Sequence, residues 1–453
     1  MFFCPNISAF RYVLILLSAA LIVPSIAMGG GVTTLKESIS FALEHNRMLA
    51  VSASGVDRAE AGVDMVTGRM LPRVDVSTGF SRTNSPLGSF GSKLQQQRIT
   101  AADFSPATLN QPGYVNNYQS RMGLTMPLFA GGAMWSSRAS AREQADASAL
   151  DFEFHKQRLI YQTIAAYVHS RQALAQVDAR NHAVKAAEKR WQDAEALQKR
   201  GMAIKSDVMD AHVHVLRSQV ALSEAENVYA ASLESLRLIL GMDEQASLNA
   251  FEEPHLNFSP EPVEQMLDEY EDRRGDLRAV KNRLEAAGYD RRQSQSAYLP
   301  RVDLMAAQEW NNEKFGLRNR NAMIGVNMTM NIFSGGADLA RVRAATSDQV
   351  MLELQLADKR QQAGNEIKQA YRSLKMAEQR FQSESEAFNQ TAESLRIKSL
   401  RHAQGLEKTS DLLDAQVRAD ASEMAHIRAK YDLITAKAAL LLAAGTLDQE
   451  VVQ

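Results

Sequence analysis

Two pairs of aspartates stand at corresponding points of the chain and are the side chains best suited to act on charged species. Asp207 and Asp210 form the first pair, and Asp411 and Asp414 form the second. Carboxylates held close together concentrate cations and repel anions. The pairs are therefore candidates for a cation-attracting site.

Each pair also lies where a helix is expected to begin, shortly after a glycine. Ser206 and Ser410 precede the pairs and could be the N-cap residues, with aspartate in the positive first turn of each helix. Capping and cation attraction are both compatible with the sequence, and both interpretations stay open.

Histidines offer the other candidate chemistry. His212 and His214 suggest a metal site, but residues two apart point to different faces of a helix. The chain shows no Ser/His/Asp constellation, phosphate-binding glycine-rich loop or His-Glu-x-x-His motif. We expect no catalytic, metal or cofactor site, and no enzyme.

The first 27 residues are typical of a secretory signal peptide. Arg11 precedes an apolar run over residues 12–23, and small residues end at Ala27. The only cysteine, Cys4, lies within this segment, so the mature chain would have no disulfide, thiolate-zinc site or cysteine catalysis. The net charge of −2 and the lack of a basic patch with aromatics argue against nucleic acid as a partner.

Nearly the whole mature chain is a duplication. Gly132 and Gly336 each end a double glycine and lie 336 − 132 = 204 residues apart, and Gly241 and Gly445 keep the same offset. We expect a first repeat over residues 28–241, a second over 263–453, and an inter-repeat linker over 242–276 that overlaps its beginning. Each repeat contains a helix pair, a β-hairpin, a long helix and a returning helix.

The hairpins are expected at residues 73–129 and 301–333. Both begin with the sequence Leu-Pro-Arg-Val-Asp, at Leu71 and Leu299, with an offset of 228. The additional 228 − 204 = 24 residues must lie between the strands of the first hairpin. The Pro- and Gly-containing stretch 84–117 predicts a long surface loop there, whereas the second hairpin has a short connection near 311–321.

Strict alternation predicts strands with one apolar face. The residues expected to face lipid are apolar and two apart: Met122, Leu124, Met126, Leu128, Ile324, Val326, Met328, Met330 and Ile332. Such strands are about as long as a tilted strand that crosses a bilayer. A lone four-stranded sheet has open edges and cannot lie in lipid, so several chains must close it.

The segments after the double glycines predict helices of unusual length. Residues 133–200 contain neither glycine nor proline, and a helix of that length would measure ~100 Å. Gly201 and Gly405 then interrupt the two helices before the returning helices. Alternating spacings of four and three from Leu413 to Leu441 predict a seam for antiparallel coiled-coil packing.

The order of these elements, given twice, resembles the TolC family of outer-membrane efflux proteins. The resemblance implies a mainly α fold with a small β part: a homotrimer with a 12-stranded transmembrane β-barrel, continued by a long α-helical barrel in the periplasm. It also implies a periplasmic adaptor protein and an inner-membrane pump of the RND or ABC type as partners. The expected location is the outer membrane, in contact with its lipid and extending into the periplasm.

The resemblance also assigns site residues. Asp411 and Asp414 match acidic residues that ring the closed periplasmic entrance in the family, with Asp207 nearby. The turns at Gly201-Met202 and Gly405-Leu406 match the adaptor-docking tips, although the family's valine is absent from both.

A tyrosine and an arginine that lock the entrance in relatives are replaced. His402 and Glu407 stand at the aligned positions and imply a different lock.

Three functions are therefore considered. The leading one is a passive exit duct for an efflux system. A type I protein secretion channel is an alternative within the same machinery. A periplasmic coiled-coil structural or adaptor protein without a pore is an alternative of another class, and the alternating strands argue against it.

Overall fold

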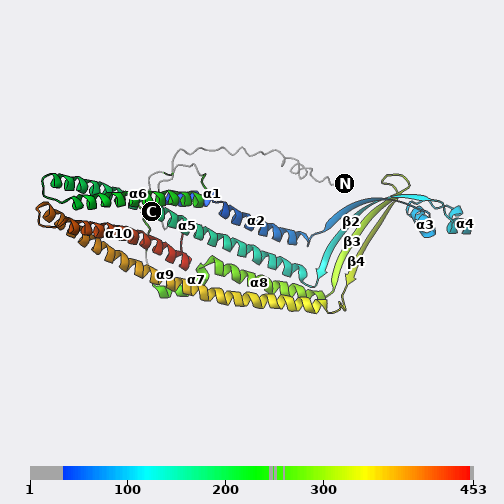
Figure 1. Ribbon diagram of the computed structural model, residues 1–453. Coiled ribbons are helices and arrows are strands. Elements are labelled where there is room, and N and C mark those ends of the chain that lie inside the picture. The colour runs from blue at the N-terminus through cyan, green and yellow to red at the C-terminus, as the bar shows by residue number, and fades with distance from the viewer. Residues whose placement is uncertain (1–33, 244–247, 249–251, 259–260, 449–453) are drawn as a thin grey trace, which may run out of the picture.

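The computed structural model describes residues 34–243, 248, 252–258 and 261–448. The expected signal peptide lies outside these residues. The molecule is elongated, with a wall of long helices at one end and a small twisted sheet at the other (Figure 1). No helix in the described part of the chain combines the length and the apolarity needed to cross a membrane.

Eight helices of the two repeats form the wall: α1 (Leu35–His45), α2 (Arg47–Gly68), α5 (Ala133–Lys199), α6 (Lys205–Leu240), α7 (Val263–Arg273), α8 (Gly275–Gln295), α9 (Ala337–Ala403) and α10 (Thr409–Ala444). The long helices α5 and α9 each have 67 residues, and α6 and α10 each have 36. At 1.5 Å per residue, α5 and α9 are each ~100 Å long. The mainly α fold class expected from the sequence is confirmed.

Four antiparallel strands form one sheet in the order β1 (Arg73–Thr83), β2 (Val115–Ala130), β3 (Arg301–Asn312) and β4 (Arg320–Thr329). β1 and β4 are its two edges. The second hairpin ends earlier than expected, since β4 stops at Thr329 and Met330 and Ile332 lie beyond it.

The segment 84–117, expected as a long surface loop, does connect the strands of the first hairpin, but it contains helices and its last three residues belong to β2. This segment contains α3 (Pro86–Gln95), a short 3-10 helix (Ala101–Phe104) and α4 (Pro106–Asn110), and β2 begins at Val115. Pro86 and Pro106 are the first helical residues, and Ser85 and Ser105 accept hydrogen bonds as their N-caps. Proline is favoured at that position because its missing N–H has no partner there anyway.

The small helices are tied to each other and to the sheet. Lys93 Nζ lies 2.6 Å from Asp103 Oδ1, and the bond from Lys93 is the main reason that the pKa of Asp103 falls to about 2. Gln96 Nε2 donates to the carbonyl of Asn116 at 2.7 Å and to Asn117 Oδ1 at 2.9 Å. The segment is therefore a folded cap on the hairpin, which we call the outer cap (residues 84–114).

Six of the eight helices form four parallel columns, and the short helices α1 and α7 pack against them. In order, the columns are α6 followed by α2, the continuous α5, α10 followed by α8, and the continuous α9 (Figure 1). Two continuous helices thus alternate with two columns that are each made of two helices. The α6/α2 column and α9 are the edges of the wall, as β1 and β4 are of the sheet.

A single asparagine joins α6 to α2. Asn46 Oδ1 accepts bonds from the backbone N–H groups of Met48 and Leu49, and its Nδ2 donates to the carbonyl of Ile239 at 2.8 Å. Gly241 ends α6 with φ +73°, and a Cβ there would come within 2.5 Å of the His45 carbonyl. Asn46 therefore caps the start of α2 and hydrogen-bonds the end of α6.

A charged cluster joins α10 to α8 at the equivalent place, since 274 − 46 = 228. Arg274 holds both oxygens of Asp276 at 3.0 and 2.9 Å, and it also donates to Glu366 at 2.6 Å and to the carbonyl of Ala443 at 3.3 Å. Lys359 Nζ lies 3.2 Å from Asp276. The Arg274 and Asp276 side chains are only 4% and 8% exposed.

This cluster decides how Asp276 ionises. Burial disfavours the charged carboxylate, but the bonds from Arg274 and the charge of Lys359 outweigh burial and hold the pKa of Asp276 below its usual value. Burial likewise opposes the charge of Arg274, whose pKa is nevertheless raised by Asp276 and Glu366. The joint therefore depends on a fully ionised pair inside the wall.

The main apolar core lies at the level of these joints, where α1, α5, α6 and α10 meet. Its largest fully buried side chains include Tyr167, Ile164 and Leu236. The inter-repeat segment crosses here, and Glu253 pairs with Arg171 at 3.2 Å. α7 occupies residues 263–273, so the second half of the expected linker 242–276 is a packed helix.

Candidate functional site

The tip of the wall consists of two identical helix-reversal turns. After α5, Gly201 has φ +73° and Met202 N–H donates to the Leu197 carbonyl at 2.9 Å. After α9, Gly405 has φ +77° and Leu406 N–H bonds the Arg401 carbonyl at the same distance. Only a left-handed residue allows this closure, which glycine adopts without strain.

The apolar residues after these glycines point into solvent. The Met202 side chain is 72% exposed and that of Leu406 is 64% exposed. Each turn thus exposes one of the predicted docking side chains, at the end of the molecule opposite the sheet.

The gate aspartates lie just inside these turns. Asp207 and Asp411 are in the first turns of α6 and α10, and Asp414 follows one turn later and is exposed. Their carboxylates therefore lie where the helix dipole is positive. Asp411 and Asp414 lie on the same helix, α10, whereas Asp207 lies on α6.

The expectation that Ser206 and Ser410 are N-caps is wrong. α6 begins at Lys205 and α10 at Thr409, so the N-cap residues are Ile204 and Lys408, and neither makes a side-chain capping bond. Each helix starts one residue before the serine, which places both serines in the first turn.

Two cations that the sequence analysis did not single out surround Glu407. Arg401 Nε lies 3.0 Å from Glu407 Oε2, and Lys398 Nζ lies 3.7 Å from Oε1. His402 Nδ1 is 3.0 Å from the Glu407 carbonyl, and Lys398 also reaches the Asp411 carbonyl at 3.5 Å. Glu407 thus ties the turn back to the end of α9, and Lys398 also reaches the first turn of α10. The signal available in the sequence was the pair of cations three residues apart just before the turn.

The two histidines considered for a metal have other contacts. His212 stacks on Trp191 with ring centroids 4.5 Å apart, and His214 Nδ1 lies 3.1 Å from Ser218 Oγ. Within the described residues, no group of three or more His, Cys, Asp or Glu side chains is placed to hold a metal ion.

The sheet has one apolar and one polar face, set by its register. Leu124 pairs with Val74 and Ala306, and Ala306 pairs with Ile324. Directly paired residues share a face, and Gln308, Thr78 and Ser120 are polar members of this one. Its apolar residues include Val74, Val76, Met122, Leu124, Met126, Phe129, Val302, Leu304, Ala306, Ile324, Val326 and Met328.

A bulge corrects one member of the predicted row. Pro127 pairs with Asp303 and Phe129 with Val302, so Leu128 is the unpaired extra residue. Pro127 has no N–H to donate to the ladder, and bulges accommodate such breaks. Phe129 therefore takes the place in the row that alternation gave to Leu128.

The polar face explains the repeated Leu-Pro-Arg-Val-Asp sequence. Arg73 lies 2.9 Å from Asp75, and Arg301 lies 2.8 Å from Asp303. Residues two apart on a strand point to the same side, so each copy places the same ion pair where its hairpin begins. Arg121 pairs similarly with Glu309 at 3.2 Å.

Comparison with known proteins decides the family. The model of the outer membrane efflux protein family matches residues 38–242 and again 266–446, so each half of the chain is matched separately. The chain belongs to this family. As an outer membrane efflux protein it is an export channel of the outer membrane that extends into the periplasm.

Several relatives of this outer membrane efflux protein have known names. The alkaline protease secretion protein AprF of Pseudomonas aeruginosa is 24% identical over 393 residues, which cover 84% of this chain and 78% of AprF. The outer membrane efflux protein BepC of Brucella suis is 24% identical over 455 residues, covering 97% and 93% of the two chains.

Solved structures share the fold. The CmeC outer membrane channel of Campylobacter jejuni superposes with a TM-score of 0.78 at 18% identity, covering 92% of this chain and 86% of CmeC. The open state of the MtrE outer membrane channel of Neisseria gonorrhoeae gives 0.75 at 18% identity, covering 92% and 90%.

Proposed function

We propose that three copies of this chain close into one continuous duct across the outer membrane and the periplasm. The sheet and the wall both have four members per chain and are both open at the first and last member. One rotation would therefore close both, giving 12 strands and 12 columns in a cyclic assembly. The observation that carries the proposal is the apolar face of an otherwise unclosed sheet, because closure removes edges that lipid does not tolerate.

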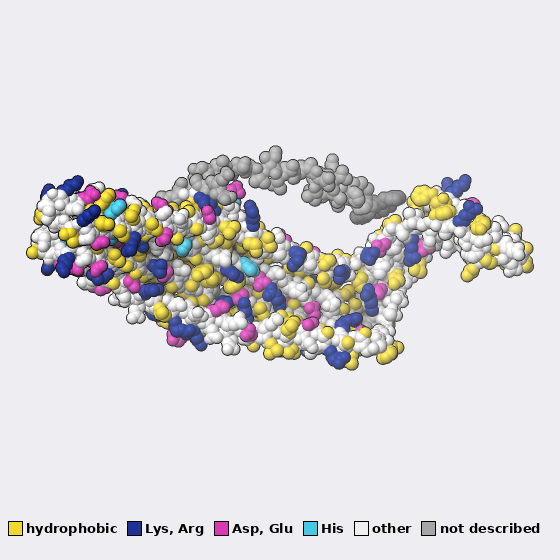
Figure 2. Space-filling model, in the orientation of Figure 1, with side chains coloured by type: hydrophobic (Ala, Val, Ile, Leu, Met, Phe, Trp, Pro, Cys, Tyr) yellow, Lys and Arg dark blue, Asp and Glu magenta, His cyan; other side chains and the backbone are white. Residues whose placement is uncertain are grey.

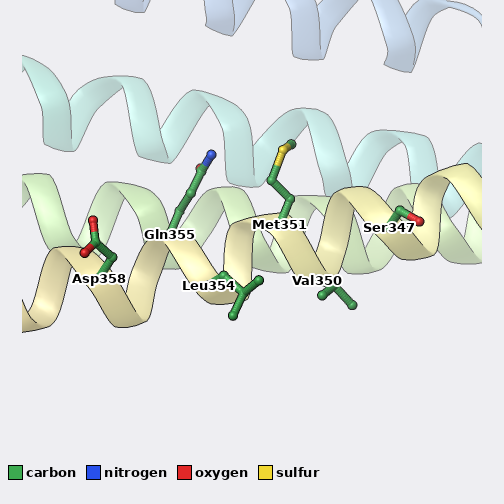
Figure 3. Close-up of a pocket in the computed structure, with 6 residues that line it drawn as sticks. All are labelled: Ser347, Val350, Met351, Leu354, Gln355 and Asp358. Carbon is green, nitrogen blue, oxygen red and sulfur yellow. The ribbon is translucent and has the colours of Figure 1, made fainter.

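Exposed apolar side chains on both edges of the wall support this closure. On the α2 edge, Met48 is 75% and Val51 64% exposed, and on the α9 edge Leu354 is 67% exposed. Figure 3 shows the α9 edge, where Val350 and Leu354 point to one side of the helix and Met351 and Gln355 to the other. Contact between α9 and the next chain's α6/α2 column would cover these residues.

In this assembly the apolar face of the sheet contacts lipid and the polar face lines the lumen. Arginine in place of Ile324, which lies midway along β4 on the apolar face, should cost ~2 to 4 kcal/mol because this site lies near the bilayer midplane. Met323 is the matched control, because it is the neighbouring residue on the opposite face. Envelope fractionation should find Met323→Arg as an outer-membrane trimer and Ile324→Arg depleted from that fraction. Equal tolerance of the two changes would refute the assignment of the faces.

At the other end, we propose that three chains bring Asp411 and Asp414 together as two stacked rings of carboxylates, with Asp207 nearby. This arrangement would favour cations in the closed state. The exposed Met202 and Leu406 provide the contacts for a periplasmic adaptor, which links the duct to an inner-membrane pump of the RND or ABC type.

The named relatives suggest two classes of cargo for this duct. A polypeptide cargo delivered by a type I machine is supported by AprF, whose name describes alkaline protease secretion and whose length this chain largely covers. An efflux cargo is supported by BepC, whose name describes an outer membrane efflux protein. Deletion of the gene followed by separate assays of secreted protein and of drug tolerance distinguishes the two.

A further inference from the structure

The outer end of the apolar face changes from aliphatic to aromatic and then to basic side chains. Phe80 pairs with Tyr118, and Trp310 pairs with Arg320. Arg82 lies two residues beyond Phe80 on the same strand and therefore on the same face. The face that we assign to lipid thus ends in an aromatic belt and two arginines, at the end of the sheet away from the helical wall.

The connection between β3 and β4 adds two cations beside this belt. Lys314 and Arg318 are exposed there, together with Phe315 at 77% and Leu317 at 67% exposure. Figure 2 shows dark-blue basic side chains next to a hydrophobic patch at this end of the sheet. We call Arg82, Lys314, Arg318 and Arg320 the outer basic cluster.

The outer basic cluster has no anionic partner within the described residues. Within the part of the chain that the structure describes, the one cation–π contact of the cluster is that of the Arg82 guanidinium, 5.0 Å from the centroid of the Tyr114 ring. By contrast, each arginine on the polar face of the sheet is paired with a carboxylate, namely Arg73, Arg121 and Arg301. The arginines of the polar face are therefore neutralised by carboxylates of the same chain. Arg82 and Arg320, on the apolar face, are available to bind an external anion.

The height of the cluster matches the edge of a bilayer. From Met328 to Arg320 the strand advances 328 − 320 = 8 residues, which is ~27 Å along the strand and ~20 Å of height at a tilt of about 40°. Apolar bands of outer-membrane barrels are ~25 Å tall with aromatic girdles at their borders. The guanidinium groups would then lie at the level of the outer headgroups.

We propose that the outer basic cluster binds the phosphate groups of phosphorylated saccharide lipids in the outer leaflet, with the aromatic belt against the sugar–acyl boundary. Guanidinium groups suit phosphate because their planar fork donates two parallel hydrogen bonds, and amphipathic aromatic rings favour the interface. This inference rests on the proposed function, because it requires the apolar face to contact lipid.

Native mass spectrometry of the detergent-solubilised oligomer tests it, with a bisphosphorylated diglucosamine lipid as the probe. The variant R82Q/K314Q/R318Q/R320Q should bind this lipid about tenfold more weakly at low salt, because cations near a membrane surface act additively within a Debye length. The matched control K185Q/R217Q/R278Q/R418Q removes three arginines and one lysine that are exposed and unpaired on the helical wall. It should bind as the wild type does.

Two further measurements define the ligand. The affinity of the wild type for the dephosphorylated lipid should be low. It should not exceed the affinity of the quadruple variant for the bisphosphorylated lipid. Inorganic pyrophosphate alone should not displace the lipid at equal concentration; if it does, the cluster is a site for soluble phosphate and the lipid proposal is wrong. Equal lipid binding by the cluster variant and the wild type, or an equal loss in the control, also overturns it.

Single-channel recording in neutral phosphatidylcholine bilayers separates this inference from the proposed function. If the wild type forms no pores there, the duct itself is refuted. If it forms pores but shows no preference for the phosphorylated lipid, only the lipid site is refuted.

Discussion

Removal of Arg274 should destabilise the wall more than removal of its counterpart in the first repeat. In Arg274→Ala, the buried Asp276 keeps only Lys359, which is 39% exposed, while Glu366 is 55% exposed and can turn to water. Breaking a buried ion pair from one side costs ~3 to 5 kcal/mol. Because Lys359 remains, we expect a loss near 3 kcal/mol per chain.

Asn46→Ala is the matched control at the other joint. It removes an N-cap, worth ~1 kcal/mol, and one hydrogen bond to the Ile239 carbonyl, worth ~1 kcal/mol. The double variant Arg274→Ala/Asp276→Ala removes the stranded charge and should be more stable than Arg274→Ala alone.

Thermal unfolding followed by circular dichroism at one fixed protein concentration measures all of these variants, since oligomer stability depends on concentration. A midpoint for Arg274→Ala no lower than that for Asn46→Ala would refute the reasoning. So would a double variant less stable than the single one.

The pH dependence provides an independent check. The folded pKa of Asp276 is lowered from its ordinary value of 3.8, so its contribution is complete above that value and is lost as the pH falls through the folded pKa. Without Arg274, burial makes this carboxyl take up a proton more readily. The difference between the wild type and Arg274→Ala should therefore shrink on acidification, and a constant difference would contradict the account.

Three other changes have distinct expected outcomes. Replacing Asp411 and Asp414 by alanine should leave trimers intact but abolish cation preference and block by a trivalent cation in single-channel recording; persistence of both would place the gate elsewhere. Shortening the outer cap (84–114) to the length of the second connection should leave trimers on native gels, and loss of assembly would show that the cap packs structurally. Gly405→Ala should cost ~1 kcal/mol or more, because φ +77° strains alanine, and an unchanged thermal midpoint would contradict this.

Periodicity and breaks predicted the architecture because long helices and lipid-facing strands follow directly from chain geometry. The absence of Gly and Pro predicted α5, and alternation predicted the apolar face. The outer cap differs from the expected loop because Pro86 and Pro106 begin helices, and each follows a serine that caps its helix. A proline can end a helix or occupy its first position, and a capping serine directly before it indicates the second case.

The joints show what the sequence could not predict. Asparagine is a favoured N-cap residue, so Asn46 carries a local helix signal. The equivalent Arg274 carries none, and its three partners come from α8, α9 and α10. Such a cluster depends on which helices lie side by side. The bulge at Leu128 is similar, because it exists only relative to the partner strand β3.

The equal lengths of corresponding helices have a consequence for how this chain can change over time. α5 and α9 have 67 residues each and α6 and α10 have 36 each, whereas the connections of the two hairpins differ by 228 − 204 = 24 residues. One inserted residue rotates everything after it in a helix by about 100° and shifts it by 1.5 Å. In a closed ring whose columns share both ends, such an insertion in one repeat would misalign the turns of every neighbour. Length variation should therefore accumulate in the hairpin connections, while the helical wall accepts substitutions but neither insertions nor deletions unless both repeats change together.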